Sequence, residues 1–403
     1  MMRGRYTFRS RRLFRGETVI LALVLLITLA VRLYYIYKFP QAWLSHDEIG
    51  YHEMTLQFLE KGFLGYYSDR PSAFVTPGYP LFLAAMYYLS ELVHNNPLVT
   101  VRTAQAIISV GSVLLVYLMA RKAGGIPAGI IAAVLVAIYP TSNMANTRLL
   151  TEVLYIFLML GYMYALIMAF DEPGFIRHAA SGALLALAVL VRPMAGPFLV
   201  IPYLVHLVFK RDFGIIKYLI TAVAAFCLVM SPWWVRNYMV FDKFIPFATQ
   251  SGNPLLRGTD PYDPYDKEGP SIIENVPEPE MTKVAIQRIK EGFKTEPWLW
   301  FKWFTIGKFS FLWGKSWGAY SGWAQTLHLW GFVVLGWLGV LVSLFDQRMR
   351  WPALMIVFSA LLHQVFIPIT RYIYPLTPLM AVMTAVLIVK IAAKILDTVY
   401  VNS

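Results

Sequence analysis

Two neighbouring acids, Asp47 and Glu48, lie in a polar run, residues 45–53, directly after an apolar stretch. Adjacent carboxylates at a helix start point in different directions. One could therefore accept a proton from a hydroxyl or amine while the other holds a cation or a polar partner. With His46 and His52, the run also offers a possible metal set in which Asp47, Glu48 and His52 are the candidate ligands, although the spacing is not diagnostic. A divalent metal is thus possible, and the sequence itself requires no cofactor.

The element that must position these acids is the apolar run 18–37. It is long enough to cross a hydrocarbon layer of about 30 Å, and we interpret it as a retained signal-anchor. Basic residues precede it, at Arg3, Arg5, Arg9, Arg11, Arg12 and Arg15. This bias predicts a cytoplasmic N-terminus and an acidic cluster on the outer side of the membrane.

The composition indicates an all-α polytopic membrane protein. Of its 403 residues 58% are hydrophobic and only 14% are charged, against about 25% charged residues in soluble domains. The net charge of +12 is expected to face anionic membrane lipids, and we expect no nucleic-acid partner. The one cysteine, Cys227, lies in an apolar stretch, so neither disulfides nor cysteine metal sites are available.

Ten apolar segments are candidate spans, within a bundle that we expect to hold about ten to twelve transmembrane helices. They are 18–37, 98–119, 126–141, 149–170, 179–192, 195–210, 215–234, 326–345, 352–369 and 373–394. Segment 76–94 is also apolar, and its placement decides the sidedness of all later segments. The positive-inside rule and its Pro-Gly-Tyr-Pro start favour an interfacial helix on the outer face over a full span.

This topology puts both termini in the cytoplasm and gathers seven charged residues and one tyrosine at the outer surface. The residues are Asp47, Glu48, Arg148, Glu152, Arg192, Arg236, Arg371 and Tyr372. Charges near the membrane usually face a cavity or a partner, so this convergence predicts a site. The alternative is that the arginines reach past helix ends to phospholipid headgroups.

The longest stretch outside the membrane, residues 241–297, predicts either a lid or a flexible connector, with a helix near 281–293. The aromatic segment 298–317 suits an interfacial helix. We therefore divide the chain into an N-terminal membrane module, 1–240, with a catalytic first external loop, 38–97, then an external region, 241–325, and C-terminal transmembrane helices, 326–403.

These residue types suit displacement at a carbon that bears a phosphate leaving group. A carboxylate would activate the nucleophile, and arginines would bind the departing phosphate in bidentate geometry. A site at the membrane surface implies that the phosphate arrives on a lipid. No Walker-type glycine loop is present, so nucleotide hydrolysis has no support.

Several motifs resemble those of GT-C glycosyltransferases, in particular the bacterial protein O-mannosyltransferase and aminoarabinose transferase group. They are Asp47-Glu48-x-x-Tyr51, Thr76-Pro77-Gly78-Tyr79-Pro80, Thr151-Glu152, Arg192-Pro193, Ser231-Pro232-Trp233-Trp234-Val235-Arg236-Asn237-Tyr238 and Arg371-Tyr372-x-x-Pro375. These motifs are distributed along the sequence from residue 47 to residue 375, so the resemblance covers nearly the whole chain.

The resemblance implies a GT-C bundle with external interfacial helices. It also implies inverting transfer of a hexosyl or pentosyl unit from a polyprenyl-phosphate (undecaprenyl-type) donor to a lipid, glycan or protein acceptor of the cell envelope. The resemblance makes Asp47 the candidate catalytic base and matches Glu152 to the acidic residue of the next external segment. Glu48, the neighbour of Asp47, is the third expected catalytic residue. The expected substrate-binding residues are His46, Tyr51, Arg148, Arg192, Arg236, Arg371 and Tyr372, with Arg371 and Tyr372 near the lipid phosphate.

Gly50 departs from the aminoarabinose enzymes, which tend to have a basic residue before the tyrosine, and this weakens the expectation of that donor. A different class of function, a transporter or flippase that moves a polyprenyl-linked lipid without forming bonds, would place charges along a path through the membrane. A structural subunit of an envelope-assembly complex would use the same charges only as ion pairs.

Overall fold

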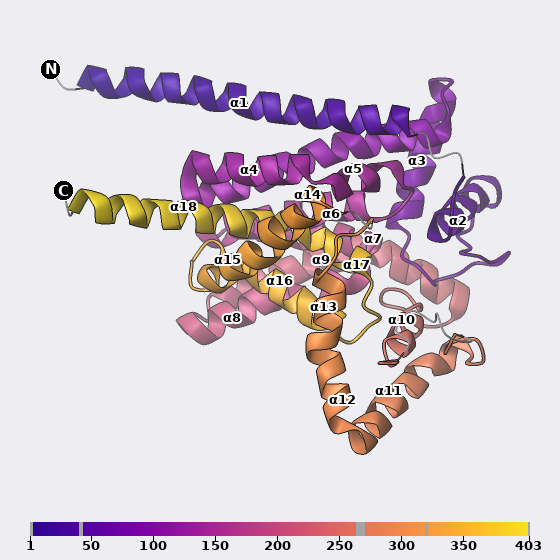
Figure 1. Cartoon of the computed structure of the whole chain (residues 1–403). Coiled ribbons are helices and arrows are strands. Elements are labelled where there is room, and N and C mark those ends of the chain that lie inside the picture. The colour runs from indigo at the N-terminus through magenta and orange to yellow at the C-terminus, as the bar shows by residue number, and fades with distance from the viewer. Residues whose placement is uncertain (1–2, 40–42, 263–270, 319–320, 402–403) are drawn as a thin grey trace.

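The structure, a computed structural model, describes residues 3–39, 43–262, 271–318 and 321–401. All regular secondary structure in these residues is helical, and most of the long helices run side by side in one bundle (Figure 1). Asp263 and Asp266 of the expected lid and the side chains of the N-terminal arginines lie outside the described part.

Seven helical segments among the described residues are long and apolar enough to cross a membrane. They are α1 (Arg3–Lys38), α4 (Pro97–Ile138), α6 (Glu152–Asp171), η1 with α8 (Pro193–Lys210), α9 (Ile215–Phe241), α14 to α15 with η3 between them (Trp323–Ser343), and α17 to α18 with η4 between them (Thr370–Thr398 of a helix that continues to Val401). Two shorter apolar helices, α7 (Phe175–Val191) and α16 (Arg350–His363), complete the bundle.

These nine segments account for the ten predicted spans. Helix α4 bends at Gly125 into two arms and so corresponds to two of the spans, 98–119 and 126–141. Gly125 has φ of 72°, a left-handed conformation that glycine adopts without steric cost. The chain is thus a multi-pass membrane protein, as its composition predicted, and the bend separates the two spans expected on either side of residue 125.

Helix α3 (Gly78–Leu92) does not cross the bundle, which agrees with the interfacial placement of 76–94. The Thr76 hydroxyl before it donates to the Val191 carbonyl at the end of α7, 3.1 Å away. After α3, the Asn96 side chain caps α4 by accepting from the Leu98 and Val99 amides. Both ends of α3 therefore lie at the end of the bundle that carries α2 (Asp47–Lys61), which we call the site end.

The opposite end, where α1 starts and α18 finishes, is called the terminal end (Figure 1). Here Arg121 Nε pairs with Glu17 at 2.7 Å, and Lys122 Nζ pairs with Asp171 at 2.8 Å. Arg348 joins Lys122 by donating to its carbonyl at 3.0 Å. These basic residues therefore lie on the side where the α1 sequence begins.

Two pairs of helices pack with their backbones in direct contact. A Cβ added to Gly182 of α7 would lie 2.1 Å from the Ala222 carbonyl oxygen of α9. One added to Gly339 of α15 would lie 2.4 Å from the Met383 carbonyl oxygen of α18. Small residues permit this close approach in membrane bundles, so no other residue fits either position without separating the helices.

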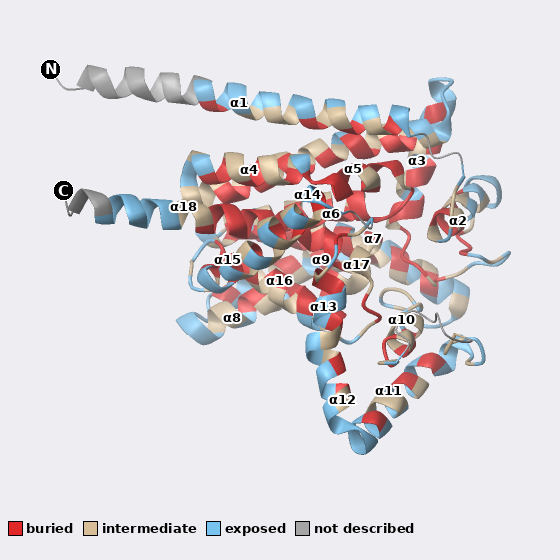
Figure 2. Ribbon diagram, viewed as in Figure 1, coloured by how far each residue is buried: buried red, intermediate tan, exposed pale blue. Residues whose placement is uncertain are grey.

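Buried residues fill the centre of the bundle, whereas the C-terminal end of α8 and residues 391–398 of α18 are exposed (Figure 2). One apolar core links residues of α2 with those of α18, and a small separate core joins α10 (Gly252–Arg257) to α11 (Glu278–Thr295) through Leu256, Met281 and Ala285. Helix α11 confirms the helix expected near 281–293.

A helical run formed by α12 (Pro297–Lys302), η2 (Trp303–Gly307) and α13 (Lys308–Trp313) follows α11. In Figure 1 this run lies across the direction of the bundle helices, and it is not among the segments long and apolar enough to span. Its exposed residues include Trp298 and Ile306. The geometry matches the interfacial helix expected from the aromatic sequence.

Candidate active site

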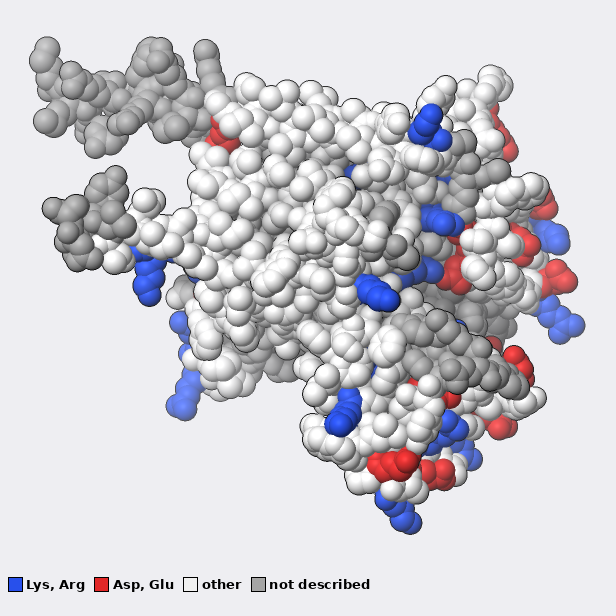
Figure 3. All heavy atoms as spheres, viewed as in Figure 1, with Lys and Arg blue, Asp and Glu red and all other residues white. Residues whose placement is uncertain are grey.

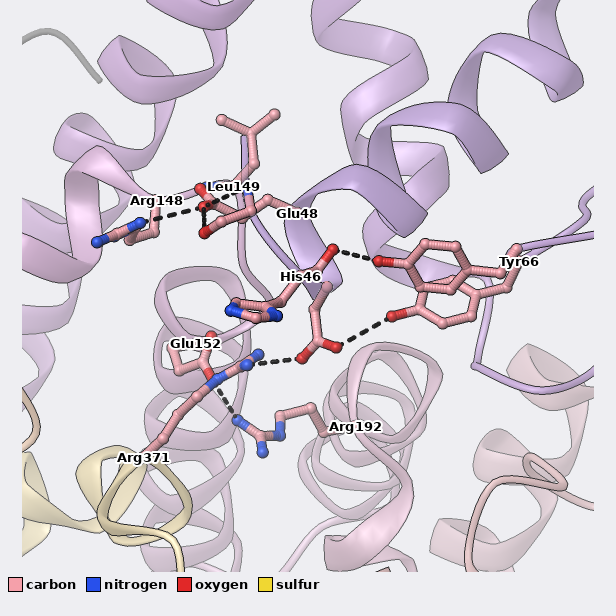
Figure 4. A network of polar contacts seen from close by, with 11 residues as sticks. His46, Glu48, Tyr66, Arg148, Leu149, Glu152, Arg192 and Arg371 are labelled. Atoms are coloured by element: carbon pink, nitrogen blue, oxygen red, sulfur yellow. Dashed lines mark hydrogen bonds and ion pairs between the residues drawn. The ribbon is translucent and has the colours of Figure 1, made fainter. Parts of the chain in front are cut away.

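Six charged side chains meet where helices end at the site end of the bundle (Figure 4). Asp47 and Glu48 form the first turn of α2, Arg148 ends α5 (Pro140–Thr147), Glu152 begins α6, Arg192 ends α7, and Arg371 lies in α17 (Thr370–Ile373). Acids are favoured in a first helical turn because the helix dipole is positive there. The same packing that buries the helices therefore brings their polar ends together.

A chain of ion pairs connects Asp47 to Arg192. Arg371 Nη1 donates to Asp47 Oδ2 at 2.7 Å, and its Nε donates to Glu152 Oε1. Arg192 Nη1 donates to the same Glu152 oxygen at 2.8 Å. Glu152 is thus shared by two guanidinium groups, and Arg371 is shared by two carboxylates.

Burial distinguishes the two acids in this chain. The Glu152 side chain is 1% exposed, whereas that of Asp47 is 47% exposed. A buried carboxylate with two arginine partners fixes their positions, since removing it would leave uncompensated charge inside the protein. Of these two carboxylates, that of Asp47 is the one open to solvent.

Glu48 turns the other way and is enclosed, with 2% of its side chain exposed. Its Oε1 accepts from the Leu149 amide at 2.9 Å, and its Oε2 accepts from Arg148 at 3.2 Å and from the Ser45 hydroxyl at 3.1 Å. These contacts tie the start of α2 to the link between α5 and α6. The two neighbouring acids therefore have separate surroundings.

Aromatic rings flank the guanidinium groups. Arg192 lies over the rings of Tyr372 and Tyr155, 5.7 Å and 5.8 Å from their centroids. Tyr51, one turn after Asp47, packs edge-to-face between Tyr66 and Tyr79. Burial, followed by the nearby Asp47 carboxylate, raises the pKa of Tyr51 above its ordinary value, so its hydroxyl remains protonated.

Two predicted substrate-binding residues, His46 and Arg236, are not members of this ion-pair chain in the described structure. His46 is exposed at the N-terminus of α2, and Arg236 donates to the Ser72 carbonyl at 3.1 Å and to Asn237 at 2.9 Å. Neither contact involves a site carboxylate. The roles expected for His46 and Arg236 stay predictions, as do the catalytic and binding roles of the residues within the ion-pair chain.

The possible metal ligands Asp47, Glu48 and His52 do not converge. Asp47 faces Arg371, Glu48 faces Arg148, and His52 Nδ1 lies 2.7 Å from the Tyr87 hydroxyl. No group of three His, Cys, Asp or Glu side chains suited to a metal occurs in the described chain. These three residues therefore do not fit a metal site.

The structure adds four residues that the sequence reasoning missed. The Tyr66 hydroxyl donates to Asp47 Oδ1 at 3.3 Å, and the Arg371 guanidinium lies 5.9 Å from the Trp317 ring centroid. Arg102, buried on α4, interacts electrostatically with Glu48, and Arg257 of α10 does so with Tyr372. Arg102 carried the clearest signal, a lone charge at the start of an apolar span.

Comparisons with known proteins bear on the fold that carries these residues. The family model of dolichyl-phosphate-mannose-protein mannosyltransferases matches residues 72–235. The solved structure of ArnT from Cupriavidus metallidurans bound to undecaprenyl phosphate is similar, with a TM-score of 0.59 and 14% identity over 92% of this chain and 60% of that one. This chain has the GT-C fold.

The archaeal oligosaccharyltransferase AglB from Archaeoglobus fulgidus, solved with an inhibitory peptide and a dolichol-phosphate, shares the fold as well. Its TM-score is 0.59, with 14% identity over 96% of this chain and 52% of AglB. No curated protein sequence matches the chain. The chain spans between half and two thirds of the length of these GT-C proteins. The resemblance to GT-C glycosyltransferases that the sequence motifs predicted is confirmed.

Proposed function

We propose that this GT-C protein is an integral-membrane glycosyltransferase that transfers a sugar from a polyprenyl-phosphate-linked donor to an acceptor. The observation that carries the proposal is the half-exposed Asp47 carboxylate, held by Arg371 beside a second guanidinium, Arg192. A lipid phosphate donor is supported by the description of the matching family and by the lipid phosphates named with ArnT and AglB.

The proposed reaction is a single inverting displacement. Asp47 accepts the proton of an acceptor hydroxyl or amine while that atom forms a bond to the anomeric carbon. The bond from this carbon to the phosphate oxygen breaks, and its electron pair leaves with the polyprenyl phosphate. Arg371 and Arg192 stabilise the charge that develops on the phosphate, and fixed guanidinium groups do so without reorganising.

Glu48 and Glu152, expected to be catalytic, receive positioning roles in this proposal. Glu152 holds Arg192 and Arg371 at their spacing, and Glu48 holds Arg148 and the start of α2. Tyr51 and Tyr372 form aromatic walls beside these groups. No step uses a metal, since the candidate ligands do not converge.

The proposed donor is a hexosyl or pentosyl polyprenyl phosphate, and the acceptor is a lipid, glycan or protein of the cell envelope. We place the site end outside and both termini in the cytoplasm, because Arg121, Lys122 and Arg348 gather at the terminal end. In a Cys227→Ser background, an impermeant thiol reagent should label Tyr67→Cys in intact cells and leave Arg121→Cys unlabelled. The reverse pattern would overturn this orientation.

The deciding experiment measures turnover by the purified protein in nanodiscs supplied with radiolabelled polyprenyl-phosphate sugars and a panel of acceptors. Wild type should move label to an acceptor and release polyprenyl phosphate. Asp47→Asn should reduce the rate by about 10²- to 10⁴-fold, the usual contribution of a general base. Asp171→Asn, at the terminal end, serves as the matched control.

Each outcome separates the proposal from its rivals. Loss of turnover in Asp47→Asn with unchanged thermal stability supports the base assignment. Equal turnover by wild type and Asp47→Asn would remove Asp47 from the reaction. Donor binding without turnover by wild type, across the whole panel, would instead favour a flippase.

A further inference from the structure

Gly50, the residue at which the motif departs from its relatives, lies beneath two tyrosine rings. A Cβ at Gly50 would lie 2.7 Å from ring atoms of both Tyr66 and Tyr67. Real Cβ atoms do not approach neighbours so closely, so both rings would have to move. The absence of a side chain at this position on α2 therefore lets both rings rest against the turn that carries Asp47.

The backbone on both sides of this contact is held in an unusual conformation. His46 and Tyr67 each have φ of 47°, a left-handed region that residues with a side chain enter at a cost. The Tyr67 hydroxyl donates to the His46 carbonyl and so joins the two positions. Strain of this kind persists only where surrounding contacts enforce it, and it concentrates at functional sites.

Tyr66 uses this arrangement to reach the Asp47 carboxylate. Its ring is buried, stacked on Phe74 with centroids 5.5 Å apart and edge-to-face with Tyr67 at 4.8 Å. Its hydroxyl donates to Asp47 Oδ1, while Arg371 donates to Oδ2 from the opposite side. Both carboxylate oxygens therefore have a fixed donor.

The Tyr66 hydroxyl remains a donor under working conditions. Burial raises the pKa of Tyr66 far above its ordinary value, and the nearby Tyr51 and Asp47 raise it further. The hydroxyl therefore keeps its proton at any pH at which the protein would act.

We propose that Tyr66 is a positioning residue that sets the orientation of the Asp47 carboxylate, and that Gly50 and Tyr67 form the lock that holds Tyr66 in place. This inference rests on the proposed function, in which Asp47 is the base. With Oδ1 and Oδ2 each held on one side, the remaining lone pairs face the open side of the carboxylate. The acceptor hydroxyl or amine must approach from there.

The first test replaces Tyr66 by phenylalanine, which removes only the hydroxyl and leaves the ring contacts. Tyr66→Phe should lower kcat about tenfold, the expected scale for one long hydrogen bond to a charged group. The KM for the polyprenyl-phosphate sugar and the melting temperature should match wild type. Tyr87→Phe is the matched control. The Tyr87 hydroxyl on α3 contacts His52 on α2, the helix that also carries Asp47, and has no hydrogen bond to Asp47 in the described structure.

The second test breaks the lock from the other side. Gly50→Ala should reproduce the fall in kcat, since its methyl group displaces both rings, whereas Gly174→Ala, which meets open space, should not. Wild-type kcat in Tyr66→Phe would overturn the proposal, as would equal losses in Tyr66→Phe and Tyr87→Phe. If Asp47→Asn abolishes transfer while Tyr66→Phe does not alter kcat, only this inference fails and the proposed function stands.

Discussion

The two ends of the bundle both carry ion pairs, but they use them differently. At the terminal end, Asp171 pairs with Lys122 at 2.8 Å and lies 3.7 Å from Arg348, and the three side chains are 22%, 24% and 54% exposed. At the site end, Glu152 binds two arginines and is almost completely enclosed. On the face shown in Figure 3, charged side chains gather towards the site end and are few over the middle of the bundle.

This difference separates anchoring from preorganisation. Open ion pairs at a membrane surface contribute about 0–1 kcal/mol each, and they tie helix ends to one another and to the headgroup region. A buried carboxylate shared by two guanidinium groups is costly to desolvate and adds little net stability, but it fixes charge in space. At the site end, part of the folding free energy is therefore lost to the desolvation of buried charges, and the fixed arrangement of charge that results can stabilise a charged transition state.

The largest effect that tests this comparison is expected from Glu152→Gln. The amide keeps the shape of the side chain but removes its charge. Arg371 then keeps one carboxylate partner, Asp47, and Arg192 keeps none of the carboxylates in this ion-pair chain. Breaking a buried pair costs about 3–5 kcal/mol, so both the melting temperature and the transfer rate should fall strongly. Thermal unfolding and turnover measured on the same nanodisc samples check this.

An unchanged melting temperature in Glu152→Gln would contradict the view that this carboxylate holds the arginines. Glu152→Asp is the control that restores the charge, and it should recover part of the lost stability.

A smaller effect is expected from Glu48→Gln. One amide oxygen can keep the bond from the Leu149 amide, but the charge that holds Arg148 is lost. Turnover should fall about tenfold, equivalent to ~1.4 kcal/mol, because the start of α2 shifts without loss of the base itself. A loss as large as that of Asp47→Asn would instead place Glu48 in the chemistry.

The smallest effect is expected from Asp171→Asn at the terminal end. Stability should change by less than about 1 kcal/mol, because Arg348 is half exposed and both Lys122 and Asp171 keep part of their side chains in solvent. Transfer should remain within about twofold of wild type, since no site residue touches this cluster and such a factor is below ~0.5 kcal/mol. A tenfold loss of transfer would erase the distinction between the two ends.

The sequence predicted the bundle well, because hydropathy reports directly on which segments lie in lipid. The apolar segments of the bundle and the helix near 281–293 follow from composition and hydropathy. The interfacial placement of 76–94 agrees with the short helix α3 and stays a prediction. The π-helical segments η2 and η3 (Leu327–Val334) carried no comparable signal. They arise from packing between helices, which one sequence does not display.

The candidate site could be predicted only in part, for a related reason. Asp47 and Arg371 are 324 positions apart, and their contact depends on how α2 and α17 pack. Motif resemblance named both residues but not their pairing. Tyr66 lies in the connection between α2 and α3, and Arg257 ends the six-residue helix α10. Neither segment is long enough for a periodicity that indicates which side chains turn towards the site.

The backbone contacts at Gly182 and Gly339 also bear on the precision of the site. Each joins a helix pair so closely that the pair resists bending as one unit, and Arg192 follows the first pair directly while Arg371 precedes α18 of the second. A methyl group at either glycine would push the helices apart and shift a guanidinium relative to Glu152. A displacement of about 1 Å can lower a reaction rate by about 10²-fold. The positional accuracy of Arg192 and Arg371 relative to Glu152 therefore depends on two residues that have no side chain, Gly182 and Gly339.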